Sequence, residues 1–111
     1  MISKYNLIFT PLLFALPLYA ALCLASEEHV VDQKNKQFDV EVLMAKKGDS
    51  VRFLNSDRFH HNIYSISETQ AFDLGSYPKG QSRTIKLDKP GTIEVRCAIH
   101  PKMKMRIEVS E

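Results

Sequence analysis

Apolar and polar residues alternate over most of the chain between residues 38 and 109. A period of two is typical of β-strands that bury one face, and no segment shows a helical period of useful length. The pattern therefore predicts about seven short strands, separated by turn residues, in an antiparallel β-sandwich or barrel. The expected strands cover residues 38–43, 51–54, 59–65, 71–75, 83–87, 92–97 and 103–109.

Two segments outside the expected strands also give predictions. Residues 26–36 are polar without a clear period, so we expect an irregular lead-in to the first strand. Residues 46–49 form a predicted turn, in which Gly48 can take a positive φ without steric cost. The length of 111 residues predicts one domain after any leader is removed.

The N-terminal end has a different composition from the rest. A short, positively charged start precedes residues 7–24, which are almost wholly apolar, and charged residues follow them. This layout predicts a signal peptide over residues 1–25, cleaved after Ala25, and a mature domain over residues 26–111. An uncleaved membrane anchor is the alternative, since 18 apolar residues are just long enough to span a bilayer.

Cysteine and charge narrow the classes of function. Acylation of Cys23 as a lipoprotein is disfavoured, because Leu22 stands where such a site has a small residue. Cleavage leaves Cys97 as the lone cysteine, so we expect its thiol to be buried or metal-bound rather than in an internal disulfide. The net charge falls from +2 to about +1, because the leader holds one lysine. That charge gives no long-range attraction to nucleic acid or membrane, and we expect neither as a partner.

The chemistry is concentrated near the C-terminal end. Cys97, His100 and Met103 bring a thiol, an imidazole and a thioether into seven residues, and a histidine pair lies upstream at His60 and His61. Thiolate and thioether favour Cu(I), whereas imidazole suits both copper oxidation states. Two imidazoles, one thiolate and a weak thioether are the ligands of an electron-transfer copper site.

Strand alternation also predicts which histidine faces inward. His61 shares a face with Phe59 and Ile63, whereas His60 points the other way. His61 is therefore the preferred ligand and His60 the alternative. The simpler interpretation is that both histidines lie on the surface. In that case, however, the downstream cysteine and histidine would lack the second imidazole nitrogen that the copper site needs.

The C-terminal donors have structural alternatives too. Cys97 ends an inward-facing row, where a buried structural cysteine is common. Met105 shares its face with Ile107, so core packing accounts for it. Met103 is consequently the preferred axial ligand.

With these residues, the sequence resembles the cupredoxins. The segment His61-Asn62-Ile63, followed far downstream by Cys97-x-x-His100-x-x-Met103, is similar to amicyanin, pseudoazurin and small plastocyanin-like methylamine-utilisation proteins. The resemblance covers residues 38–109, although this chain has His60 where the family often has proline. It implies a Greek-key antiparallel β-sandwich of about seven to eight strands.

The resemblance also implies a site and a function. His61, Cys97 and His100 are the expected equatorial ligands of one copper ion that cycles between Cu(I) and Cu(II), with Met103 as the axial ligand. Asn62 is expected to hydrogen-bond across to the ligand loop near Cys97. The implied protein is a monomeric type 1 (blue) copper protein, a soluble periplasmic electron carrier that meets redox partner proteins.

Other features bear on partners. A ring of lysines, Lys79, Lys102 and Lys104, is either a docking rim for an acidic partner surface or a solvated edge. No catalytic carboxylate pair, triad or serine-nucleophile context is visible in the sequence, so we do not expect an enzyme.

Three alternatives remain at this stage. Periplasmic copper delivery or buffering would use the same ligands, and a chain starting at Glu27 would place His29 third, where it chelates Cu(II). A metal-free β-sandwich interaction module leaves the four donors unexplained. Zinc in place of copper is disfavoured by the methionine ligand.

Overall fold

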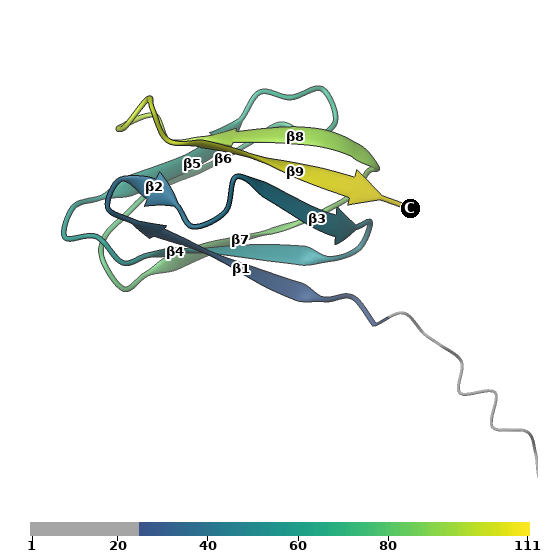
Figure 1. The fold of residues 1–111 in the computed structure, drawn as a ribbon, viewed down its shortest axis with the longest axis horizontal. Coiled ribbons are helices and arrows are strands. Elements are labelled where there is room, and N and C mark those ends of the chain that lie inside the picture. Colours follow the sequence, from purple (N-terminus) through teal and green to yellow (C-terminus); the bar gives the residue numbers. More distant parts are fainter. Residues whose placement is uncertain (1–24) are drawn as a thin grey trace, which may run out of the picture.

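The computed structural model describes residues 25–111 and shows two β-sheets packed face to face (Figure 1). One sheet has the strand order β2-β1-β4-β7 and the other β3-β9-β8-β5-β6. The predicted all-β sandwich is therefore confirmed. Its nine strands within the described residues are β1 (Glu28–Lys34), β2 (Gln37–Phe38), β3 (Val42–Lys46), β4 (Ser50–Asn55), β5 (His61–Ser65), β6 (Phe72–Tyr77), β7 (Ser82–Lys86), β8 (Gly91–Arg96) and β9 (Lys104–Ser110).

The sheets are mixed rather than purely antiparallel. β1 runs parallel to β4, and β3 runs parallel to β9, whereas the other pairs are antiparallel. Alternation along the sequence identifies a strand but not the direction of its neighbour, so the pattern could not predict these pairings. The strand count also exceeds the expected seven to eight.

The expectation of an irregular lead-in was wrong, because residues 28–34 form strand β1. Its inward row consists of His29, Val31 and Gln33, so polar residues occupy two of three positions and hide the apolar period. Gln33 is fully buried, and its Oε1 accepts a hydrogen bond from the Tyr77 hydroxyl on β6 of the opposite sheet. A polar pair thus bridges the core where the pattern method expects two apolar residues.

The single strand expected over residues 38–43 is two strands in different sheets. Phe38 ends β2, and Val42 begins β3. The Asp39 backbone N–H donates to Asp32 O on β1 at 2.9 Å, whereas Glu41 O accepts from Arg106 N–H on β9 at 3.0 Å. The chain therefore crosses from one sheet to the other within these residues while the alternation continues.

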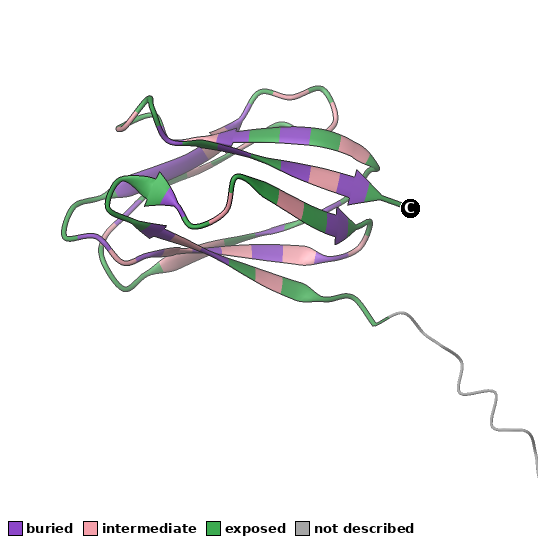
Figure 2. Ribbon diagram, in the orientation of Figure 1, coloured by how far each residue is buried: buried purple, intermediate pink, exposed green. Residues whose placement is uncertain are grey.

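The core lies between the sheets, and buried residues alternate with exposed ones along most of the strands (Figure 2). Gly48 takes a φ of 94° in the turn before β4, as predicted. Over residues 25–111, no helix is long and apolar enough to cross a membrane. The predicted signal peptide lies outside the described residues, apart from Ala25.

Candidate metal centre

Three metal-ligating side chains meet at one end of the sandwich. His61 begins β5, Cys97 directly follows β8, and His100 lies in the loop from β8 to β9. One donor atom from each lies within 4.8 Å of the other two. His61 and Cys97 are fully buried, and His100 is half-buried. The fold therefore brings together residues that are 36 positions apart in the sequence.

The loop between β8 and β9 is closed by its own backbone. The Cys97 N–H donates to Met103 O at 3.4 Å, and the Met103 N–H donates to His100 O at 2.9 Å. Met103 is 2% exposed and enters the core at the base of this loop. Met105 is also buried, but it lies opposite Val95 in the β8–β9 ladder. Its position agrees with the expected core role.

The two adjacent histidines have opposite environments. His61 is fully buried and His60 is exposed, which is the orientation that alternation predicts. Phe59 departs from the predicted inward face and is 37% exposed, because regular β5 begins only at His61. Its ring instead packs against His61 and His100, with centroids 5.2 and 5.0 Å away.

The ring nitrogens are oriented as a metal centre requires. His61 Nδ1 faces Cys97 Sγ at 3.7 Å, while Nε2 of the same ring is bonded to Asp57. His100 Nδ1 is buried and has no hydrogen-bond partner among residues 25–111. An unpaired buried nitrogen is costly in a folded protein, and a metal ion would satisfy it. The donor set therefore fits copper.

Asp57 is a functional residue that the sequence did not reveal. Its carboxylate is almost fully buried and lies 2.7 Å from His61 Nε2. Burial raises the pKa of Asp57, but hydrogen bonds from the Lys36 N–H, His61 and the Asn35 N–H outweigh this effect and lower the pKa overall. An ionised carboxylate therefore fixes the His61 ring and its tautomer.

His100 is electrostatically suited to bind a metal. Burial is the largest cause that lowers its pKa, and Coulombic interactions with His61 and Lys36 lower it further, against an opposing effect of Asp57. The neutral imidazole is the form that coordinates a metal ion.

Asn62 connects the start of β5 to the cysteine loop. Its backbone N–H donates to Cys97 Sγ at 3.3 Å, and its Oδ1 accepts from the Ala98 N–H at 3.3 Å. Its Nδ2 donates to Asp73 Oδ1 at 3.0 Å, which fixes the amide orientation. The contact expected between Asn62 and the cysteine loop is thus present.

Comparison with known families decides the assignment. Residues 25–110 match the family model of copper-binding proteins of the plastocyanin/azurin family. The chain belongs to this family. Membership, together with the His–Cys–His cluster, identifies one copper ion as the cofactor.

Individual proteins of related sequence and structure agree with the family. The methylamine utilization protein MauL of Methylorubrum extorquens is 33% identical over 100 residues, which cover 89% of this chain and 87% of MauL. The structure of a Cu(I) amicyanin variant matches with a TM-score of 0.71 and 25% identity, over 81% of this chain and 89% of amicyanin.

An enzyme also contains a similar domain. A copper-containing nitrite reductase from Thermus scotoductus matches with a TM-score of 0.71 and 28% identity, over 76% of this chain. The match covers only 22% of the reductase, so it carries no information on that enzyme's activity for this chain.

Proposed function

We propose that this protein is a type 1 copper protein that carries electrons between redox partners, with His61, Cys97 and His100 as equatorial ligands and Met103 as axial ligand. The observation that carries the proposal is the convergence of two imidazoles on a buried thiol, with His61 Nδ1 at 3.7 Å from Cys97 Sγ. Copper bound there supplies a one-electron couple between Cu(I) and Cu(II).

The chain holds these donors in a rigid arrangement. Asp57 fixes one imidazole, Asn62 fixes the cysteine loop, and backbone hydrogen bonds close that loop at Met103. Because the ligand atoms are held in place, they rearrange little when copper changes between Cu(I) and Cu(II). Cys97 is fully buried, which supports outer-sphere electron transfer over chemistry on a bound substrate.

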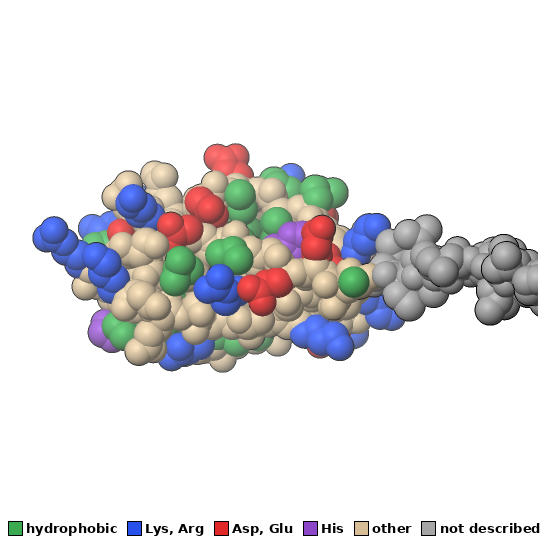
Figure 3. Space-filling model, turned by 90° about the horizontal axis from the view of Figure 1, so that it is seen from below, with side chains coloured by type: hydrophobic (Ala, Val, Ile, Leu, Met, Phe, Trp, Pro, Cys, Tyr) green, Lys and Arg blue, Asp and Glu red, His purple; other side chains and the backbone are tan. Residues whose placement is uncertain are grey.

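The surface around His100 supplies the proposed electron port. Phe59 and Ile99 are large apolar residues that are 37% and 48% exposed. The Phe59 ring packs against the half-buried His100 imidazole, and Ile99 directly precedes His100 in the sequence. Lysine and arginine side chains gather at this end of the molecule (Figure 3). The exposed basic residues in the loops and strand ends at this end of the sandwich include Lys36, Arg58, Lys79, Lys102 and Lys104. Lys36 Nζ lies 5.5 Å from the centroid of the Phe59 ring.

This arrangement suits a partner with acidic groups around an apolar contact. A solvated rim without a docking role is the competing interpretation of the same lysines. We also propose cleavage after Ala25 and a monomeric periplasmic protein. The intact mass of the exported chain would give the cleavage position, and sedimentation would give the oligomeric state.

Electron self-exchange tests the carrier role without a known partner. Adding Cu(II) protein to Cu(I) protein should broaden NMR lines, which reports fast exchange. Ile99→Lys should slow the exchange. Ile66→Lys should not, because Ile66 lies beyond the far end of β5 and is, at 84% exposed, even more accessible than Ile99 at 48%. Equal rates in both variants would contradict the proposed port.

Copper delivery or buffering is the competing function. It requires a metal that leaves readily, so rapid loss of Cu(I) to a chelator, combined with slow self-exchange, would favour it. Retention of copper over hours with fast self-exchange would support the carrier.

A further inference from the structure

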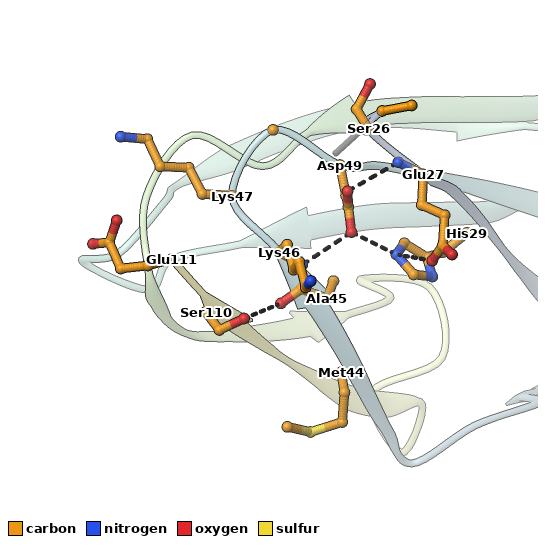
Figure 4. Close-up of a pocket in the computed structure, with 12 residues that line it drawn as sticks. Ser26, Glu27, His29, Met44, Ala45, Lys46, Lys47, Asp49, Ser110 and Glu111 are labelled. Carbon is orange, nitrogen blue, oxygen red and sulfur yellow. Dashed lines mark hydrogen bonds and ion pairs between the residues drawn. The ribbon is translucent and has the colours of Figure 1, made fainter. Parts of the chain in front are cut away.

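A second group of metal-ligating side chains lies at the opposite end of the sandwich. Glu27, His29 and Asp49 each place one donor atom within 4.8 Å of the other two (Figure 4). His29 lies in the inward row of β1, which carries Val31 further along, and Glu27 directly precedes this strand. Asp49 directly precedes β4, which runs parallel beside β1 with His29 opposite Val51. The alternation along β1 turns His29 inward, and the parallel pairing of β1 with β4 places it beside Asp49.

Two distances within the group are close to the separation of ligand atoms around a metal ion. His29 Nε2 lies 2.9 Å from Asp49 Oδ2 and 3.5 Å from Glu27 Oε2. Ligand atoms at about 2.0–2.1 Å from tetrahedral Zn²⁺ are about 3.3 Å apart. The two distances lie on either side of this value. Since ionised carboxylates only accept hydrogen bonds, Nε2 carries a proton, and the metal would take the place of that proton.

Asp49 is held in position independently of His29. Its Oδ1 accepts from the Glu27 N–H and its Oδ2 from the Lys46 N–H, both at 2.9 Å. Oδ2 retains a second lone pair, which now faces His29 and would face the metal. A ligand oriented by two backbone donors loses little freedom on binding.

The group is accessible from solvent. It lines a surface pocket of about 430 Å³ beside the turn that contains Gly48. The side chain of Glu27 is 77% exposed, while those of His29 and Asp49 are 16% and 8% exposed. An ion can therefore reach the donors, and water can complete its coordination. Lys46 and Lys47 also line the pocket and oppose a cation, whereas Glu111 on the same rim favours one.

We propose that Glu27, His29 and Asp49 form a second metal site, for a divalent ion that accepts nitrogen and oxygen ligands, such as Zn²⁺. The site contains no sulfur donor, so it selects against Cu(I), which the centre around Cys97 prefers. Occupancy would link the beginning of β1 to the beginning of β4. The inference does not depend on the proposed electron-carrier function.

The test uses the copper-loaded, reduced protein, in which Cu(I) occupies the first centre and remains diamagnetic. Titration with Zn²⁺, followed by calorimetry and by NMR of the His29 ring, should show one zinc per chain with copper retained. His29→Ala and Glu27→Gln should each weaken zinc binding at least tenfold. His60→Ala, which removes an exposed histidine at the other end, should leave the affinity unchanged.

Each outcome decides the proposal. Zinc binding of equal strength in His29→Ala, or no binding to the parent protein, would overturn the site. A loss in His29→Ala but not in Glu27→Gln would overturn the three-ligand assignment. Glu27→Gln changes an exposed side chain whose backbone N–H bond to Asp49 stays intact, so this variant tests the site even if His29→Ala fails to fold.

Discussion

Replacing Asp57 by asparagine should raise the reduction potential of the copper centre. The wild-type carboxylate accepts hydrogen bonds from the Asn35 and Lys36 N–H groups and from His61 Nε2. Asparagine offers a single acceptor oxygen, so at least one of these donors would face an NH₂ group, and in either orientation His61 would meet a neutral amide in place of a carboxylate. The His61 imidazole then becomes a weaker donor to copper, and one buried negative charge near the centre disappears.

The structure sets the expected size of the effect. A hydrogen bond to a charged group contributes about 1.5–3 kcal/mol, and loss of such a partner typically lowers metal affinity about 10–100-fold. The oxidised ion has the higher charge and depends more on this carboxylate. If Cu(II) affinity falls about tenfold more than Cu(I) affinity, the potential rises by about 59 mV, the value for a one-electron couple.

Voltammetry at pH 7 measures this shift, with Asp73→Asn as the matched control. Asp73 is exposed and bonds to Asn62 rather than to a proposed ligand, yet its replacement removes the same charge. A rise in Asp57→Asn well above the rise in Asp73→Asn supports the role of the carboxylate. Equal shifts in both variants, or a lower potential in Asp57→Asn, would refute the reasoning.

Three further predictions follow from the structure. Met103→Ala should retain copper but change its reduction potential. Met105→Ala should leave the potential unchanged and lower the free energy of unfolding by about 2–5 kcal/mol, because it leaves a cavity in the core. The reverse result in voltammetry and urea unfolding would exchange the two roles. Gly91→Ala should lower stability by about 1–3 kcal/mol, since φ is 133° and the new Cβ would lie 2.8 Å from Thr69 Oγ1; Gly80→Ala, at φ 83° in open space, should cost less in the same assay. The pKa of Asp49 is lowered from an ordinary 3.8 to about 2, and the hydrogen bond from His29 is the largest cause. As the pH falls, Asp49 takes up its proton first in the unfolded chain. The ionised carboxylate should therefore add about 2 kcal/mol to the free energy of unfolding above pH 4, and this contribution is lost as the pH falls toward 2. Urea unfolding of the metal-free protein between pH 5 and 2 should show that loss, and Asp49→Asn should not.

The sequence predicted the parts of the site that are local. Cys97, His100 and Met103 lie in one loop, so their spacing already limits how far apart they can be. His61 needed only the alternation along its own strand, which also separated it from His60. These inferences depend on the geometry of single elements.

The missed features depend on how distant segments meet. Asp57 lies just after the strand expected over residues 51–54, where the pattern gives no further information. Its contact with His61 follows from the path of the loop before β5. Strand β1 was missed because Gln33 is a buried polar residue whose partner, Tyr77, lies 44 residues away. Parallel pairing of β1 with β4, which places His29 beside Asp49, is likewise invisible to a period of two.

The most direct test of the account is an optical and spin-resonance titration of residues 26–111 with Cu(II), beside a Cys97→Ser variant. We expect an intense blue band with narrow copper hyperfine splitting in the parent protein, saturating at one copper per chain and absent from the variant. A colourless complex, or a spectrum that is the same in Cys97→Ser, would contradict the thiolate-bound copper centre.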